Sequence, residues 1–425
     1  MSFGYNEDLL QFIWEYQLYD SKQLTISTGE EVTILKQGFL NKNSGPDFSN
    51  AQLKIGETTL YGAIEIHVNA NEWTQHNHHT DKAYNAVILH VCYTHNSDAV
   101  REDGTSIPTV ALGDRILQKS LTQYEQLMEN KPFIPCENAI RLVSDFNVKL
   151  WVNRMAVERL EVRCKLFQTY LESCAGDWNQ AFFWAIVRAF GMPTNTEAFA
   201  ELAEQLPFYL IQKHHESLFQ LEALVFGTAG LLADHGQDNY YTELQNEYNF
   251  LSKKYGLATI SSQMKMGRMR PMNLPHVKLA QLAAFFHHAP LFIAQVLTLP
   301  SPSEVKGMLT FELSDYWLSH YSFKRESKKR SKSISAGFVN HLFLNALVPF
   351  VFFYEKNKGD GATDHALKYL ENIPTEKNSI ITRWRNIEMD SDNALESQGL
   401  LHLYKTYCQN QRCLECNIGK KILLR

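Results

Sequence analysis

Residues 43–67, which read NSGPDFSNAQLKIGETTLYGAIEIH, combine two carboxylates and a histidine in a pattern that suits a metal-dependent hydrolase. Asp47 follows a Gly-Pro turn, whereas Glu65 and His67 lie two residues apart in a run of strand-forming residues. Because side chains alternate along a strand, Glu65 and His67 point to the same face. Two carboxylates can hold Mg²⁺ and leave room for a phosphate group and a nucleophilic water. The pattern therefore predicts that Asp47 and Glu65 bind the cation and that His67 activates the water.

A simpler interpretation of the same residues needs no ligand. Asp47 can be an ordinary turn residue after proline. Strand alternation places Ile64 and Ile66 on one face, so the opposite face with Glu65 and His67 can be the solvent-exposed side of a half-buried strand. The sequence leaves both interpretations open.

A histidine-rich segment follows in residues 73–90, WTQHNHHTDKAYNAVILH. Imidazole and carboxylate groups at this density can contribute to a metal or phosphate site. An exposed polar loop is the alternative, and the segment lacks the regular spacing of a helical zinc site. The candidates in it are His76, His78 and Asp81, with His79 and His90 nearby.

Three cysteines near the end of the chain form a second chemical signal, C-x4-C-x2-C, at Cys408, Cys413 and Cys416. Thiolates this close together can hold Zn²⁺ or an iron–sulfur cluster. The fourth ligand has to come from elsewhere, and the alternative is three ordinary packing residues. The candidates for the fourth ligand are Cys136, Cys92, Cys174 and His402.

The pattern of apolar residues predicts which elements position these groups. Residues 6–19 have the spacing of an amphipathic helix, and residues 24–93 contain about five short segments typical of strands, the first of them LTIST at 24–28. After about residue 140 the pattern turns helical, with a loop expected at 256–276. We therefore expect an α+β fold, with a mixed-sheet domain over residues 1–140 and a mostly helical domain over 141–425 that carries the cysteine cluster.

The net charge of −5 in 425 residues neither supports nor excludes a nucleic-acid partner. Binding would need local basic patches, and two runs offer them: residues 267–278, with Arg268 and Arg270, and residues 323–332, FKRESKKRSK. Solvated loops are the alternative for both runs.

We find no signal-peptide pattern and no uninterrupted apolar run of the roughly 18 residues that a membrane span needs. The expected location is the cytoplasm, with no membrane partner. Seven cysteines without the spread of a secreted disulfide framework indicate reduced thiols. The oligomeric state is left open.

The order helix, strand, strand with GPDF, strand with EIH, polar crossover and apolar strand resembles the core of the PD-(D/E)XK nuclease superfamily. The resemblance implies a nuclease-like first domain and a Mg²⁺-dependent cleavage of nucleic acid. It implies that Asp47 and Glu65 are the two acids and that Glu15 or Glu7 is the acid on the first helix. His67 stands where the superfamily has lysine, which would stabilise phosphate charge more reliably.

The whole chain resembles a bacterial family known as domain of unknown function 2851, through elements spread along most of its length. These elements are GPDF, EIH, W-x2-H and LHV near the start, MRPMNLPHVKLAQLA at 269–283, and YCQNQRCLECNIG near the end. This resemblance implies no activity.

Two hypotheses follow from the sequence. The first is a Mg²⁺-dependent nuclease whose helical domain clamps the substrate, and the intact acid pair favours it. The second is a non-catalytic scaffold that binds nucleic acid or protein, with a degenerate nuclease-like domain and a structural metal site, and the histidine at position 67 favours it. Neither distinguishes DNA from RNA, or endonuclease from exonuclease.

Overall fold

The computed structural model describes residues 4–129, 133–233, 238–358 and 363–425, and the chain divides into two compact units. The first unit comprises Met1–Trp151 together with Leu403–Arg425, and the second comprises Val152–His402. The sequence analysis assigned the C-terminal segment to the helical domain, whereas the structure groups it with the first unit. Helical periodicity indicates that a segment is a helix, but it does not indicate which partner the helix packs against.

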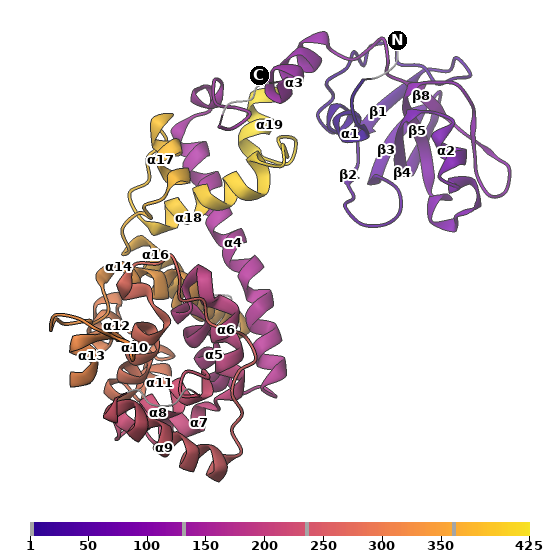
Figure 1. Ribbon diagram of the computed structural model, residues 1–425. Helices are drawn as coiled ribbons and strands as arrows, with labels where there is room; N and C mark the ends of the chain where they lie inside the picture. Colours follow the sequence, from indigo (N-terminus) through magenta and orange to yellow (C-terminus); the bar gives the residue numbers. More distant parts are fainter. Residues whose placement is uncertain (1–3, 130–132, 234–237, 359–362) are drawn as a thin grey trace. The chain divides into compact units, whose positions relative to one another are not determined.

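A six-stranded mixed sheet forms the centre of the first unit (Figure 1). Its order is β1-β3-β4-β5-β8, with β2 paired to β3. The pairs β1–β3 and β3–β4 are antiparallel, whereas β4–β5 and β5–β8 are parallel. The strands are β1 (Val32–Lys36), β2 (Phe39–Leu40), β3 (Phe48–Ile55), β4 (Thr58–Asn69), β5 (Val87–Thr94) and β8 (Thr109–Ala111).

Helical segments cover both faces of this sheet (Figure 1). Helix α1 (Glu7–Glu15) packs Leu10, Ile13 and Trp14 against one face, in a core that includes Ile64 and Ile66. The opposite face is covered by α2 (Glu72–Gln75), η1 (His78–Thr80) and η2 (Lys82–Tyr84), whose Trp73 is fully buried. The sheet is therefore an inner layer, and polar residues on β4 are enclosed.

The remaining elements of the first unit come from two parts of the sequence, the residues that follow the sheet and the C-terminal segment. Helix α19 packs against α3 and η3. These elements are β6 (Ala99–Val100), β7 (Ser106–Ile107), α3 (Gln118–Glu129), η3 (Ile140–Leu142), the beginning of α4 (Asp145–Ser173), the π-helical η6 (Leu403–Cys408) and α19 (Asn417–Leu423).

In its described residues, the second unit is helical apart from the hairpin of β9 (His320–Ser322) and β10 (Arg325–Glu326) and an isolated bridge between Pro374 and Asn393, and its core is rich in phenylalanine. Its helices are α5 (Trp178–Phe190), α6 (Met192–Gln205), α7 (Phe208–Lys213), α8 (Leu218–Thr228), α9 (Asn239–Tyr255), α10 (Pro275–His288), α11 (Phe292–Val296), α12 (Pro302–Met308), α13 (Asp315–Ser319), α14 (Ala336–Leu342), the π-helical η5 (Phe343–Leu347), α15 (Val348–Asn357), α16 (Asp364–Glu371), α17 (Ser379–Asn386) and α18 (Ala394–His402), with the 3₁₀ turn η4 (Pro271–Asn273). The α+β prediction is confirmed, and the expected loop at 256–276 lies between α9 and α10.

Two details of the sequence analysis were wrong. The segment 24–28 is not a strand, because only Thr25 forms a bridge, to Glu31 across a tight turn. The short strand β8 was not expected, because its three residues are too few to show a period.

One long apolar helical stretch lies in the second unit. Residues Ala336–Asn357 are long and apolar enough to cross a membrane by length and composition. Of the 18-residue apolar window in this helix, 72% is buried inside the second unit, as in the core helix of a soluble protein. Because the helix carries a few polar residues, the sequence shows no unbroken apolar stretch there.

Candidate functional site

The polar face of β4 is buried. Glu65 is 5% exposed and His67 is 1% exposed, while Ile64 and Ile66 on the opposite face are fully buried. The interpretation of this face as a solvated surface is therefore excluded. Burying a carboxylate and an imidazole costs free energy unless they have partners, so their surroundings matter.

Asp47 joins the start of β3 to β4 through its own hydrogen bonds. Its backbone N–H donates to Glu65 Oε2 at 3.1 Å, and its Oδ2 accepts from the Ile66 N–H at 2.9 Å. Its Oδ1 accepts from Gln11 Nε2 of α1, also at 2.9 Å. Asp47 is thus fixed beside Glu65, rather than being a free turn residue.

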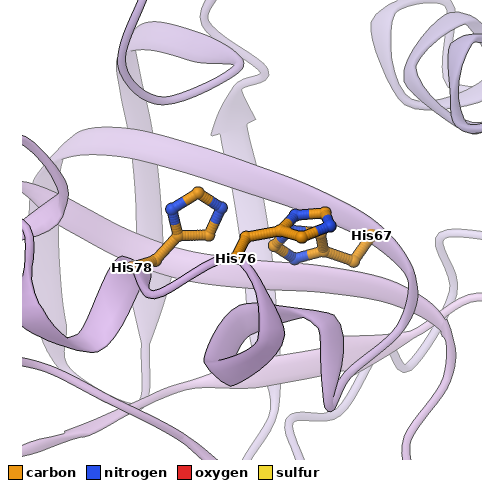
Figure 2. A group of neighbouring side chains, drawn as sticks. All are labelled: His67, His76 and His78. Carbon is orange, nitrogen blue, oxygen red and sulfur yellow. The ribbon is translucent and has the colours of Figure 1, made fainter.

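Three histidines gather over this face of the sheet. Figure 2 shows His67 on its strand, with His76 and His78 on the adjoining segment. The ligand nitrogens of the three side chains all lie within 4.8 Å of one another. Glu65 Oε1 lies 3.3 Å from His78 Nε2 and 3.7 Å from His67 Nε2. We call Asp47, Glu65, His67, His76 and His78 the acid–histidine site.

Secondary contacts hold two of these rings in place. The Nδ1 atom of His67 lies 3.0 Å from Nε2 of His90, the residue opposite Glu65 on β5. His78 stacks on Tyr84 with ring centroids 3.8 Å apart. If His67 donates its Nδ1 proton to His90, its Nε2 lone pair is free to bind a cation, which is how neighbouring groups commonly orient metal-binding histidines.

The electrostatics of the site also favour a cation. Burial raises the pKa of Glu65 to about 9 and that of Asp47 to about 6, and the negative charge of Asp47 raises the pKa of Glu65 further. Burial lowers the pKa of His67 to about 2 and that of His78 to about 4. The histidines are therefore neutral near pH 7, which is the form that binds metals.

Asp81 caps η2, where its side chain accepts from the Ala83 N–H at 2.9 Å, and its charge acts on the neighbouring His78.

Two acids of α1 add to the field of the site. The charge of Asp8 raises the pKa of Asp47, and the charge of Glu7 raises that of Glu65. Burial raises the pKa of Glu7 itself to about 7, with a further contribution from the charge of Asp47. Glu15 lies two turns further along α1 and lines a cavity together with Asp47.

That cavity has a volume of about 540 Å³ and reaches Asp47 from the surface of the first unit. Its lining is mainly polar and includes cationic side chains, so it can accept a polar or anionic molecule. The residues include Gln11, Lys42, Tyr124, Arg412 and Lys420.

The C-terminal cysteines have a fourth thiol beside them. Burial raises the pKa of Cys408 well above its usual value, and the neighbouring thiols of Cys136, Cys413 and Cys416 raise it further. The other candidates for a fourth ligand have different partners. Cys92 donates to the Val110 carbonyl, Cys174 to the Tyr170 carbonyl, and His402 pairs with Glu158.

The candidate basic patches lie in the second unit. Arg268 and Arg270 are exposed on the loop before α10, and Lys328, Lys329 and Arg330 are exposed after β10. Lys332 differs, because it is fully buried and its Nζ donates to the carbonyls of Trp317 and Leu318. Lys332 is therefore a structural residue rather than part of a phosphate-binding surface.

The sequence predicted most residues of the acid–histidine site but not the residues that hold them in place. It did not single out Gln11, and it left Glu7 and Cys136 among several alternatives. Glu7 lies one helical turn before Gln11, so the two side chains share a face of the helix. This spacing is the signal that could have identified Glu7 and Gln11.

Comparison with known proteins places the chain in a family and no further. A family model described as "Protein of unknown function (DUF2851)" matches residues 7–379. Comparison with curated proteins and with solved structures gives no match. The chemistry of the site therefore has to be inferred from its own residues.

Proposed function

The chain belongs to the DUF2851 family of proteins of unknown function, and from that premise we propose that its first unit is a metal-dependent phosphodiesterase that acts on nucleic acid. The observation that carries the proposal is the convergence of Glu65 with three histidines whose ligand nitrogens lie within 4.8 Å of one another. Three imidazoles and an adjacent carboxylate form a complete set of donors for one divalent cation.

The order of elements around the site supports a nuclease-like core. Helix α1 precedes an antiparallel meander of β1, β3 and β4, and the 72–84 crossover leads to β5, which is parallel to β4. The resemblance to the PD-(D/E)XK superfamily implies this order. It also implies an acid at the start of the second long strand and another on the third, where Asp47 and Glu65 lie.

The donor atoms change the cation that we propose. Mg²⁺ prefers oxygen ligands and retains water, whereas imidazole suits transition metals such as Zn²⁺ and Fe²⁺, with Mn²⁺ a weaker-binding member of the same first-row series. With three nitrogens beside Glu65, a transition-metal cation fits this site better than the Mg²⁺ expected from the sequence. Such a cation supplies a Lewis acid for a phosphoryl oxygen and lowers the pKa of a bound water.

The side chains then take distinct roles. His67, His76, His78 and Glu65 hold the cation, and His67 becomes a ligand rather than the water-activating base. Asp47 fixes Glu65 through its backbone N–H and faces the cavity through which substrate enters. The cationic side chains of Lys42, Arg412 and Lys420 line the same cavity and can contact phosphate groups.

One observation favours the alternative, a non-catalytic scaffold that binds nucleic acid or protein. His67 replaces the lysine of the resembled superfamily, and its Nδ1 is engaged by His90 at 3.0 Å. In that case the cation would only stabilise the fold, and nucleic acid would bind without being cut.

The test is a cleavage assay with the full chain, stripped of metal and then supplied with Mn²⁺, Zn²⁺ or Mg²⁺. Single- and double-stranded DNA and RNA serve as substrates. We expect Mn²⁺ to support cleavage, and Asp47→Asn and Glu65→Gln each to reduce the rate by about 100-fold or more. Asp98→Asn, an exposed acid of the same unit, is the matched control and should cleave normally. Cleavage at the wild-type rate in both site variants would remove these residues from the mechanism, and binding without cleavage would favour the scaffold.

A further inference from the structure

Four cysteines from distant parts of the sequence lie in the first unit, on two segments that pack against each other through η3 and α19. Cys408 ends η6, and Cys413 and Cys416 lie in the loop before α19. Cys136 lies in a turn before η3, where its carbonyl accepts from the N–H groups of Ala139 and Ile140. All four are free thiols, and Cys136, Cys413 and Cys416 are less than a tenth exposed.

Close packing holds the two segments together. Phe133 stacks on Tyr404 with ring centroids 4.6 Å apart, and Trp151 meets Tyr407 edge-on at 5.9 Å. A Cβ atom at Gly419 would lie 2.2 Å from the carbonyl oxygen of Cys413, so only glycine lets α19 approach the cysteine loop this closely. The arrangement of the thiols is therefore built into the fold of the unit.

A buried donor beside the cysteine segment lacks a partner. Cys416 is the N-cap residue of α19, and the buried indole N–H of Trp151, whose ring meets Tyr407 of η6, has no hydrogen-bond partner among the described residues. Hydrogen bonds to sulfur stabilise thiolates in metal centres and tune their properties.

We propose that Cys136, Cys408, Cys413 and Cys416 bind a thiolate-ligated metal centre that holds the wall of the cavity beside Asp47. The cavity is lined by Asn410, Gln411 and Arg412, which lie between the first two C-terminal cysteines, and by Leu414 and Glu415, which lie between the last two. The ligand set stands by itself, whereas the role of the cavity wall rests on the proposed phosphodiesterase function.

Two contacts join this wall to the sheet and to α1. Glu415 Oε2 lies 3.3 Å from Lys42 Nζ, and Lys420 Nζ donates to the Tyr16 hydroxyl at 3.2 Å. Both pairs are partly exposed, and such pairs contribute little stability. A metal centre would supply the rigidity that these contacts lack.

The spacing of the thiols favours an iron–sulfur cluster over a single zinc ion. Among the described residues, no three of the four sulfurs lie within 4.8 Å of one another. In a tetrahedral zinc site with Zn–S bonds of about 2.3 Å, by contrast, all the sulfurs lie roughly 3.8 Å apart. The iron and sulfide atoms of a cluster fill such a wider space.

The experiment is elemental analysis of the full chain purified without oxygen, with iron, acid-labile sulfide and zinc measured per chain. The variants are Cys136→Ser and Cys413→Ser, and the matched control is Cys174→Ser, a thiol of the second unit. We expect iron and sulfide in the wild type and the control, and a loss of at least about tenfold in both site variants. Zinc lost in the same pattern would support the ligand set with the other metal. Metal-free protein, or a content unchanged by Cys136→Ser, would overturn the proposal.

A second measurement uses the folded wild type, so it does not depend on the variants folding. Iodoacetamide labelling before and after metal removal, read by mass spectrometry, should show the four cysteines becoming reactive together, with Cys174 unchanged. If iodoacetamide labels Cys136 to the same extent before and after metal removal, the proposal is wrong.

Cleavage assays on the same samples separate the two proposals. If the cysteines bind metal but the protein cuts no nucleic acid, the proposed ligand set is supported and the proposed phosphodiesterase function is wrong. Cleavage that needs Asp47 in a protein whose cysteines hold no metal would do the reverse.

Discussion

The two units bury ionisable side chains in opposite ways. In the second unit, Glu222 is fully buried and accepts hydrogen bonds from the hydroxyls of Tyr240 and Ser314. Glu355 likewise accepts from the backbone N–H groups of His365 and Ala366. In the acid–histidine site of the first unit, by contrast, Glu65 lies beside a second acid and beside two histidines that burial keeps neutral.

This difference separates structural polar groups from a site. A buried acid with its own donors is complete, and nothing more is needed to explain it. Like groups that converge repel one another and leave lone pairs directed at a common point, which costs stability unless a cation occupies it. Substitutions in the two units should therefore have different consequences.

The largest effect should be on cation binding. His78→Ala removes one nitrogen ligand and should weaken Mn²⁺ binding by about 100-fold or more, because even indirect supports of metal ligands are worth 10- to 100-fold. His95→Ala, which removes a histidine paired with Asp98 in the same unit, is the control. Calorimetric titration of metal-stripped protein measures both, and Mn²⁺ avoids competition from the thiols. Equal affinities in the two variants would remove His78 from the site.

Removing a buried acid should have different effects in the two units. Glu222→Ala removes the shared acceptor of two partly buried hydroxyls and creates a cavity, so it should lower the free energy of unfolding of the second unit by about 3 kcal/mol. Glu65→Gln, measured with chelator present, replaces a carboxyl group whose raised pKa keeps it protonated near pH 7, so it should cost little. Urea denaturation of both variants gives the comparison. A large loss from Glu65→Gln without metal would mean that Glu65 is structural.

The pH dependence of the second unit follows from Glu222. Burial raises its pKa from 4.5 to about 7, although the hydrogen bonds from Tyr240 and Ser314 oppose the shift. The folded state therefore binds this proton more tightly, so the stabilisation is complete below pH 4.5 and is lost as pH rises through 7. Between pH 5 and pH 7 we expect a loss of about 2 kcal/mol, measured by urea denaturation. Glu222→Gln should flatten this dependence, and an unchanged slope would assign it to other groups.

The smallest effect concerns the exposed cations of the second unit. Replacing Lys328, Lys329 and Arg330 together by alanine should weaken nucleic-acid binding and reduce the slope of log affinity against log salt by up to about 3. Lys332→Ala should instead destabilise the fold, because that lysine is buried and caps the Trp317 and Leu318 carbonyls. Fluorescence anisotropy at several salt concentrations measures the slope. Binding that is unaffected by the triple change would leave this run as a solvated loop.

The sequence predicted the elements of the site better than their surroundings. The spacing of Glu65 and His67 placed them on one face of a strand, and the structure places them so. It could not reveal whether that face is buried, because an alternating strand looks the same when covered by a helix or by water. The enclosing residues come from the 72–84 crossover, whose polar sequence is typical of an exposed loop.

Long-range partners were beyond the sequence for a related reason. Cys136 was one of four candidates for the same role, and only the packing of η3 against α19 selects it. The C-terminal segment has helical periodicity, so it was assigned to the helical domain although it packs within the first unit. Local patterns determine which faces of an element are apolar, whereas the partner of each face depends on tertiary contacts.

The most direct test of the central claim is a crystal structure of the full chain soaked with Mn²⁺ after metal removal, with anomalous diffraction to locate the ion. The account predicts an anomalous peak bounded by the imidazole nitrogens of His67, His76 and His78 and a carboxylate oxygen of Glu65. The His78→Ala crystal should lose that peak. A wild-type crystal without a peak between these four side chains, at a Mn²⁺ concentration that supports cleavage, would contradict the account.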